Sequence, residues 1–256
     1  MSHGTPCPGI RRGRRLLRLA ATGALLVLIA PAGAQAAPAP PATAVLSHPL
    51  PVPRQEIALT FDDGPGSAAT AKILALLRSH GAHATFFVLG TELERYPGLA
   101  AEAAREGNEL ADHGMSHRAF PRLGAKRLLY ELRTTADLIL ELTGRSPAFV
   151  RPPYGRVNQR VVQVARSLHM TVALWTLDTR DWQNPGAAAI ARRVLEHVRP
   201  GEIVLMHDGG GPRPQTVEAV RMILAGLDAR GYTSVTLGQL VRDARPVAAA
   251  PARHGA

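Results

Sequence analysis

The stretch Thr60-Phe61-Asp62-Asp63-Gly64-Pro65 decides both the fold and the chemistry of this 256-residue chain. The apolar run at 57–59 predicts a buried strand, and Gly-Pro is a turn signal, so the two carboxylates should lie where the strand ends. Adjacent carboxylates repel each other unless a positive charge lies beside them, and a metal ion is the usual one. An Asp-Gly pair alone is more often a simple turn, so the interpretation depends on the motifs further along the chain.

Two histidines four residues apart occur in one of these motifs, His113-Gly114-Met115-Ser116-His117. On their own they would more often be surface or capping residues than ligands. Together with one carboxylate they complete a three-ligand hydrolytic metal site, and the second carboxylate is left free to act as a base.

The chain between these motifs and beyond them alternates between strand-like and helix-like patterns. Such alternation predicts a parallel sheet, either open or closed into a barrel. The predicted strands are 57–60, 84–88, 109–111, 148–150, 171–176, 203–206 and 233–236, and the predicted helices are 67–80, 91–107 with a turn at Pro97, 125–142, 158–168, 185–198 and 216–229.

Polar clusters follow five of the predicted strands. In a barrel of alternating strands and helices, the carboxyl ends of the strands meet on one face, where chemistry is placed. The sequence therefore predicts that these clusters converge on one site: Asp62 with Asp63, His113, Arg151, Asp178 with Asp181, and His207.

The order and spacing of these motifs resemble a known family. After the two motifs above come Arg151-Pro152-Pro153-Tyr154-Gly155, then Asp178-Thr179-Arg180-Asp181-Trp182, then Leu205-Met206-His207-Asp208. This series resembles the polysaccharide deacetylases (NodB-homology domain, carbohydrate esterase family 4) over residues 56–242. The resemblance implies an α/β fold, a distorted (β/α) barrel in a single domain, that removes acetyl groups from N-acetylated sugars.

The resemblance also implies a role for each matched residue. The implied metal ligands are Asp63, His113 and His117, with Zn²⁺ expected and Co²⁺ or Ni²⁺ compatible with the same ligands. The implied catalytic set is Asp62 as base, His207 as acid, Arg151 holding the base and Asp181 orienting the acid. The implied substrate contacts are the backbone N–H of Tyr154, which binds the oxyanion, and an apolar wall of Trp182 and Leu205 beside the acetyl methyl. We also expect Trp182 to lie in the core.

One position departs from the family pattern. The family usually has Ser or Thr directly after the first metal histidine, and this chain has Gly114 there. The lost hydroxyl puts the rigidity of the loop in doubt more than metal binding itself, and Ser116 is a candidate substitute.

The ends of the chain differ in composition from its middle. Five arginines (11, 12, 14, 15 and 18), a short apolar run at 19–30 and Ala34-Gln35-Ala36 predict a signal peptide over 1–36, with an uncleaved anchor as the alternative. Arg14 and Arg15 match a twin-arginine signal only in part, so we expect export by the ordinary route. We expect a Pro/Ala-rich linker at 37–54, the catalytic domain at 55–243 and a disordered tail at 244–256. A secreted, cell-wall-associated protein is the expected result.

The charge and the cysteine content limit which partners and which covalent links we expect. The formal charge of +10 falls to +5 when the five signal arginines are removed. No basic patch interleaved with aromatic residues argues for nucleic acid. The one cysteine, Cys7, lies in the predicted signal, so no disulfide is expected. We expect a monomer without stable membrane insertion after signal cleavage.

The leading functional hypothesis is a secreted, metal-dependent N-deacetylase of N-acetylglucosamine-containing glycans, with peptidoglycan first and chitin oligosaccharides second. An acetyl xylan esterase is an alternative on the same fold. A catalytically inactive glycan-binding module is a further alternative. Such modules usually lack the base, a ligand or the acid, and this chain has all of them: Asp62, Asp63, His113, His117 and His207.

Overall fold

The computed structural model describes residues 45–66 and 68–244. The predicted signal peptide and all but one residue of the predicted tail lie outside these ranges. The strands are β1 (Glu56–Gly64), β2 (Ala84–Val88), β3 (Glu109–Asp112), β4 (Phe149–Val150), β5 (Thr171–Val172), β6 (Leu177–Asp178), β7 (Ile203–His207) and β8 (Thr233–Ser234). The α-helices are α1 (Ala69–Ser79), α2 (Gly90–Arg95), α3 (Pro97–Arg105), α4 (Ala125–Thr143), α5 (Gln159–Ser167), α6 (Ala187–His197), α7 (Pro214–Asp228) and α8 (Leu237–Asp243).

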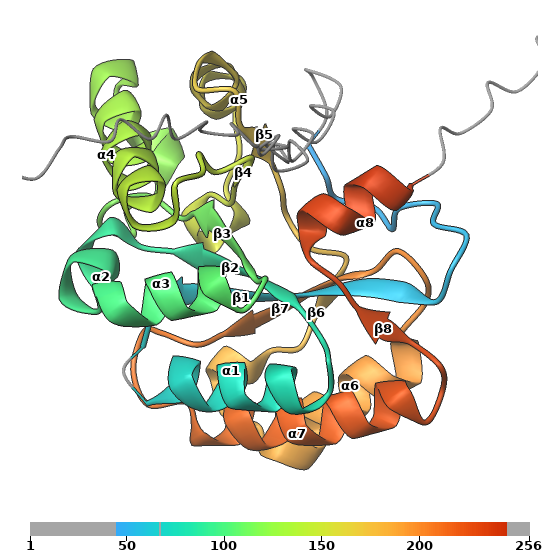
Figure 1. Ribbon diagram of the computed structural model, residues 1–256. Helices are drawn as coiled ribbons and strands as arrows, with labels where there is room; N and C mark the ends of the chain where they lie inside the picture. The colour runs from blue at the N-terminus through green and yellow to red at the C-terminus, as the bar shows by residue number, and fades with distance from the viewer. Residues whose placement is uncertain (1–44, 67, 245–256) are drawn as a thin grey trace, which may run out of the picture. The chain divides into compact units, whose positions relative to one another are not determined.

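The strands form one curled sheet in which all the pairings are parallel (Figure 1). Its order is β5-β4-β3-β2-β1-β7-β6, with β8 pairing separately with β1. Among the described strands, no ladder joins β5 to β6, so the barrel is incomplete along that seam. The predicted α/β distorted barrel is confirmed.

The central strand β1 is buried almost throughout because helices cover the sheet on both faces. On one side α1, α6 and α7 pack together beneath the sheet in the view of Figure 1. Fully buried aliphatic residues from these helices, such as Ile73, Ile190 and Ile223, fill the core between helix and sheet. This packing fixes the sheet whose carboxyl ends carry the polar motifs.

Local signals explain several of the element boundaries. The side chain of Asn158 accepts a hydrogen bond from the amide of Val161 (3.0 Å) and caps α5. Gly144, at φ +71°, ends α4 in the left-handed conformation that glycine tolerates best. Pro214 opens α7, where its missing N–H has no intrahelical partner to lose.

Two predicted strands differ from those observed, and one observed helix was not predicted. The strand predicted at 57–60 runs on through Gly64, so Asp62 and Asp63 belong to the strand and do not follow it. The strand predicted at 171–176 is only the two-residue β5, and an unpredicted strand, β6, follows at 177–178 on the opposite edge of the sheet. Helix α8 was not predicted, although Thr236 caps it by accepting the amide hydrogen of Gln239.

The segment 45–54 was predicted to be part of a linker, and this prediction is wrong for the described residues. Leu46 pairs with the chain just after β5: its amide bonds to Val172 O (2.9 Å) and its carbonyl accepts from Leu174 N (2.8 Å). The amide of Leu50 bonds to Gly201 O, just before β7. We call residues 45–52 the N-terminal strap, because this segment reaches across the open seam of the sheet.

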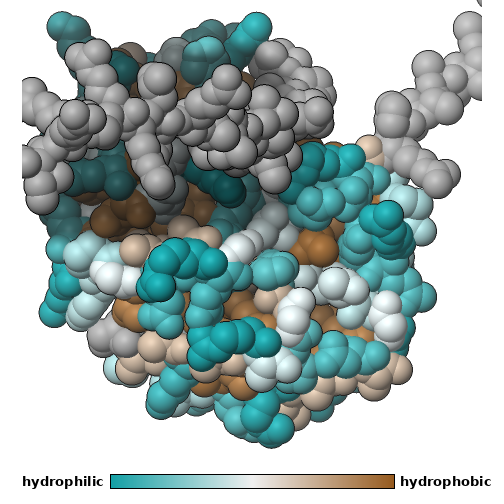
Figure 2. Space-filling model, viewed as in Figure 1, coloured by the Kyte–Doolittle hydropathy of each residue, from teal (hydrophilic) through white to brown (hydrophobic). Residues whose placement is uncertain are grey.

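The exterior is of mixed polarity. On the face drawn in Figure 2, hydrophilic residues alternate with small apolar patches over the helices below the sheet. Within residues 45–66 and 68–244, no helix combines the length and apolar character needed to cross a membrane.

Candidate metal centre and active site

Asp63, His113 and His117 come together at the carboxyl end of the sheet. Asp63 lies at the end of β1, and the two histidines lie in the loop that follows β3. Each offers one ligand atom, and these atoms lie within 4.8 Å of one another. The Nε2 atoms of His113 and His117 are 3.4 and 3.1 Å from Oδ1 of Asp63. The structure thus brings together the three residues that the resemblance implied as metal ligands.

The surroundings of this triad fit a divalent cation. Oδ1 of Asp63 is buried and makes no hydrogen bond of good geometry with any residue that the structure describes, although two imidazoles face it. Nδ1 of His113 lies 2.6 Å from the carbonyl oxygen of Arg151, which fixes the tautomer with Nε2 free to bind a metal. Burial alone would raise the pKa of Asp63, but the two imidazoles hold it well below its usual range. Two neutral nitrogens and one carboxylate oxygen form a donor set suited to zinc.

Asp62 lies beside the triad and is held by Arg151. The guanidinium of Arg151 donates from Nη1 to Oδ1 of Asp62 (2.7 Å) and to the hydroxyl of Thr60 (2.8 Å). Its other nitrogens donate to the carbonyls of Ala173 and Leu174. The side chain is fully buried and lies over the ring of Phe87 at 3.9 Å. Burial lowers the pKa of Arg151, and Asp62 partly offsets that effect. The pair holds the carboxylate of Asp62 in one orientation.

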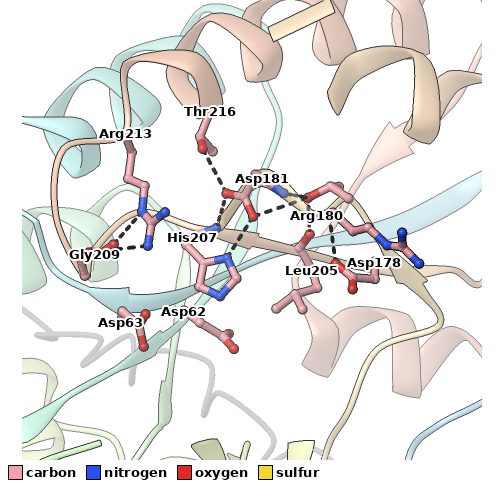
Figure 3. A network of polar contacts seen from close by, with 12 residues as sticks. Asp62, Asp63, Asp178, Arg180, Asp181, Leu205, His207, Gly209, Arg213 and Thr216 are labelled. Carbon is pink, nitrogen blue, oxygen red and sulfur yellow. Dashed lines mark hydrogen bonds and ion pairs between the residues drawn. The ribbon is translucent and has the colours of Figure 1, made fainter. Parts of the chain in front are cut away.

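His207 lies next to Asp62 because β1 and β7 pair these two residues. Nδ1 of His207 is 2.8 Å from Oδ1 of Asp181, and Oδ2 of Asp181 accepts from the His207 amide and the Thr216 hydroxyl, both at 2.8 Å (Figure 3). Burial lowers the pKa of His207, but the hydrogen bond and charge of Asp181 raise it more, so the net shift is upward. The structure thus contains an imidazole poised to donate a proton from Nε2.

The loop that carries the histidines is fixed by two buried carboxylates. Oδ1 of Asp112 accepts from the amide of Gly114 (2.6 Å). Glu131, fully buried on α4, accepts from both the amide and the hydroxyl of Ser116 (2.9–3.0 Å) and from Arg127. The predicted substitute for the missing hydroxyl, Ser116, therefore does hold the loop, through Glu131.

Packing explains why residue 114 is a glycine. Its φ is +84°, and a Cβ built on it would lie 2.8 Å from two ring carbons of the buried Phe120. A Ser or Thr at this position would be strained in backbone and would collide with that ring.

Backbone strain also marks the site. Asp63, His117 and Tyr154 have φ values of 71°, 53° and 64°. Non-glycine residues rarely adopt such values, and those that do cluster where function holds them in place. The ring of Tyr154, 63 % exposed, meets the ring of His117 at 4.8 Å between centroids. Tyr154 therefore lies beside the triad, where its backbone N–H was expected to act.

The two residues expected in the apolar wall differ in burial. Leu205 is buried in β7, next to Asp62 and His207 in the view of Figure 3. Trp182 is 50 % exposed, so the prediction that it lies in the core is wrong. It follows Asp181 in a short 3₁₀ helix, which leaves its indole at the surface.

Sequence reasoning missed several residues that support the site. Glu131 could have been suspected, because it falls on the buried face of α4 between Leu128 and Leu132. Thr216 and Thr60 carried no local signal, since their partners are distant in sequence. Asp208, to which no catalytic role was assigned, is fully buried against the end of β1 and binds the Thr70 hydroxyl, and burial raises its pKa to about 7.

Comparison with known proteins identifies the family. The family profile described as "Polysaccharide deacetylase" matches residues 50–173. A peptidoglycan-N-acetylglucosamine deacetylase of Bacillus cereus is 38% identical over 195 residues, covering 75% of this chain and 91% of that protein. A chitooligosaccharide deacetylase of a Bradyrhizobium species is 35% identical over 198 residues, covering 73% of this chain and 90% of that protein.

The solved structures agree with the sequence comparison. The peptidoglycan deacetylase PdaC from Bacillus subtilis superposes with a TM-score of 0.70 at 37% identity, over 75% of this chain and 92% of that one. The fold is therefore the one that these relatives have. The chain belongs to the polysaccharide deacetylase family. It is accordingly a hydrolase that acts on non-peptide amide bonds.

Proposed function

We propose that this chain is a metal-dependent N-deacetylase of N-acetylglucosamine-containing glycans, with peptidoglycan as the first substrate and chitin oligosaccharides as the second. The observation that carries the proposal is the pairing of Asp62 with His207 across β1 and β7, directly beside the triad of Asp63, His113 and His117. Amide hydrolysis needs a base that takes a proton from water and an acid that protonates the departing nitrogen, and this pairing places the two candidates side by side.

The triad would hold a divalent cation, which supplies Lewis acidity toward the acetyl carbonyl and the attacking water. Asp62 takes a proton from water as the oxygen attacks the carbonyl carbon. Arg151 donates a hydrogen bond to the carboxylate of Asp62 and prevents it from turning away. The backbone N–H of Tyr154 donates to the developing oxyanion, a contact of a kind whose loss costs on the order of 100-fold in rate.

His207 completes the reaction. Its Nε2 proton passes to the departing nitrogen as the carbon–nitrogen bond breaks, so the products are acetate and an amino sugar. Asp181 holds the imidazole in the charged form that can give this proton. Leu205, and Trp182 from the surface side, would enclose the acetyl methyl.

We also propose that the protein works outside the cell, on the strength of the signal-like sequence at 1–36. A monomer would suffice, because the described residues of one chain supply every group that the mechanism uses.

Acetate release tests the proposal. The chain from Ala37 onward would be assayed on N-acetylglucosamine oligomers, isolated peptidoglycan and acetylated xylan, with chelator and with added Zn²⁺. Release from the N-acetylated glycans that is lost with chelator and restored by metal is expected. Release from xylan alone would replace the proposal with an esterase, and no release with metal bound would favour a glycan-binding role.

Two variants test the proposed roles of Asp62 as base and of His113 as metal ligand. Asp62→Asn is expected to lower turnover by a factor of about 100 or more while metal still binds at one equivalent, because it removes the base and leaves the triad. His113→Ala is expected to lose the metal. A near-normal rate for the first variant, or stoichiometric metal in the second, would overturn that assignment.

A further inference from the structure

A cavity opens beside the triad, and the charged residues that line it are all basic. Its volume is about 530 Å³, and its lining is His117, Arg118, Ala119, Arg122, Leu123, Tyr154 and Arg156. Three of these seven residues are arginines and none is acidic. We call this cavity the arginine groove.

No carboxylate of the described residues neutralises the three arginines of the groove. Within the described residues, Arg118, Arg122 and Arg156 form no ion pair within 4.0 Å, whereas Arg127 and Arg221 each pair with a glutamate on their own helix. Three unneutralised guanidinium groups around one cavity make a site that favours an anion.

A second cavity, beside Gly66 and the end of β1, has a lining of mixed charge. It holds basic residues too, Lys72, Arg95 and Arg213, but its lining includes the acidic Glu92 and Asp208. That cavity therefore carries acidic as well as basic side chains. The two cavities differ in electrostatic character, so they would differ in which part of a charged glycan they accept.

The arginine groove is continuous with the catalytic centre. The ring of His117, a member of the triad, contacts the ring of Tyr154, and the guanidinium of Arg156 lies 5.8 Å from the Tyr154 ring centre. On the other wall, the buried Phe120 anchors the 3₁₀ helix that ends in Arg122. A sugar residue next to the one being deacetylated would therefore have its substituents in the groove.

We propose that the arginine groove binds a carboxylate of the glycan substrate, and so makes acidic N-acetylated glycans better substrates than neutral ones. This inference rests on the proposed deacetylase function. A planar guanidinium matches a carboxylate with two parallel hydrogen bonds. In peptidoglycan that carboxylate has two sources: the lactyl group of muramic acid when no peptide is attached, and the peptide stem when one is. Attachment of the stem converts the lactyl carboxylate into an amide, so the two sources exclude each other on one sugar.

The test is the ratio of kcat/KM on acidic and neutral substrates. The acidic substrates are glycan strands stripped of peptide and the same strands with stems, and the neutral substrate is an N-acetylglucosamine oligomer. Arg122→Gln and Arg156→Gln are each expected to lower the acidic-to-neutral ratio by about fivefold, and the double variant by more. Added salt should lower the wild-type ratio in the same direction, because the arginines are exposed. Arg133→Gln, which removes an exposed arginine of α4 outside the groove, is the matched control.

The outcomes separate the alternatives. A ratio that falls on stripped strands identifies the lactyl carboxylate, and one that falls only on strands with stems identifies the stem. A ratio that does not change in the double variant, or that changes equally in Arg133→Gln, overturns the groove proposal while acetate release leaves the deacetylase function standing. Absence of acetate from every substrate with wild-type protein would instead overturn the proposed function.

Discussion

At the scale of single residues, the buried carboxylate of Asp181 contacts both the imidazole and the backbone of His207. One of its oxygens contacts the imidazole of His207, and the other accepts from the His207 backbone and from Thr216. The side chain thus sets both the orientation and the charge of the proposed acid. Asp178, in the same motif, instead accepts the amide hydrogen of Arg180 (2.8 Å).

We expect Asp181→Asn to move the alkaline limb of the kcat/KM profile to lower pH. The carboxylate raises the pKa of His207 against the effect of burial, so its removal leaves burial to lower that pKa. Activity needs the imidazolium and is lost as pH rises through its pKa, so the loss would begin at lower pH. At neutral pH we expect kcat/KM to fall on the order of 100-fold. Asp178→Asn is the control, and equal shifts in both variants would contradict the assignment.

Individual residues of the site were predictable where a motif placed them. Asp62, Asp63, His113, His117, Arg151 and His207 all fall within ordered short motifs, and the structure brings them together. Residues that act through long-range contacts were not predictable: Thr60 meets Arg151 and Thr216 meets Asp181 across large sequence separations. The exposure of Trp182 was missed because an aromatic residue after a strand is equally compatible with core and surface.

At the scale of elements, helix α4 supports the loop that carries His113 and His117. The helix contributes one buried acid, Glu131, whose carboxylate binds both Ser116 and Arg127. Its neighbours Leu128 and Leu132 are fully buried, so the position of Glu131 is fixed by packing. The loop between the two histidines is therefore tied to a helix that would otherwise have no part in the site.

We expect Glu131→Gln to weaken Zn²⁺ binding by about tenfold, because a glutamine keeps only one accepting oxygen for the donors of Ser116 and Arg127, which weakens one of the two anchors of the loop. The measurement is a competition titration of metal-free protein against a zinc chelator of known affinity. Glu141→Gln changes an exposed acid on the same helix and is expected to leave the affinity unchanged. Wild-type affinity in Glu131→Gln would show that the loop does not need this anchor.

Elements with strong internal signals were predicted well. Strand β2 and helix α4 match their predicted ranges closely, because β2 is an unbroken buried run and α4 has a long amphipathic pattern ended by Gly144. The short strand β5 was predicted too long and β6 was missed, since a two-residue strand leaves almost no periodicity. Helix α8 was missed because a helix of seven residues carries little pattern of its own.

At the scale of the whole molecule, the N-terminal strap connects regions that the sheet leaves apart. Leu46 bonds beside β5, which ends one edge of the sheet, and Leu50 bonds to the chain that enters β7, near the other edge. Both leucines also pack on a core cluster that includes Phe149, Ala173 and Ile203. No local pattern could have shown this, because a Pro-rich segment looks the same whether or not it packs on a domain.

We expect the double variant Leu46→Ala, Leu50→Ala to lower the free energy of unfolding by about 2 kcal/mol, because both side chains lose part of their apolar burial. Urea unfolding followed by circular dichroism measures this. His48→Ala, an exposed change within the same strap, should leave the midpoint in place. An unchanged midpoint in the double variant would mean that the strap does not contribute to stability.

The contact between Gly114 and Phe120 restricts the order in which mutations can accumulate. A hydroxyl-bearing residue at 114, as in the usual family pattern, would meet the Phe120 ring at 2.8 Å. The exchange cannot be made in one step without a steric penalty, and replacing Phe120 first would open a cavity in a buried cluster. Replacing Phe120 would remove the clash but not the strain of a positive φ at residue 114, so a residue with a side chain at 114 requires both a smaller residue at 120 and a different loop backbone, and these features should vary together.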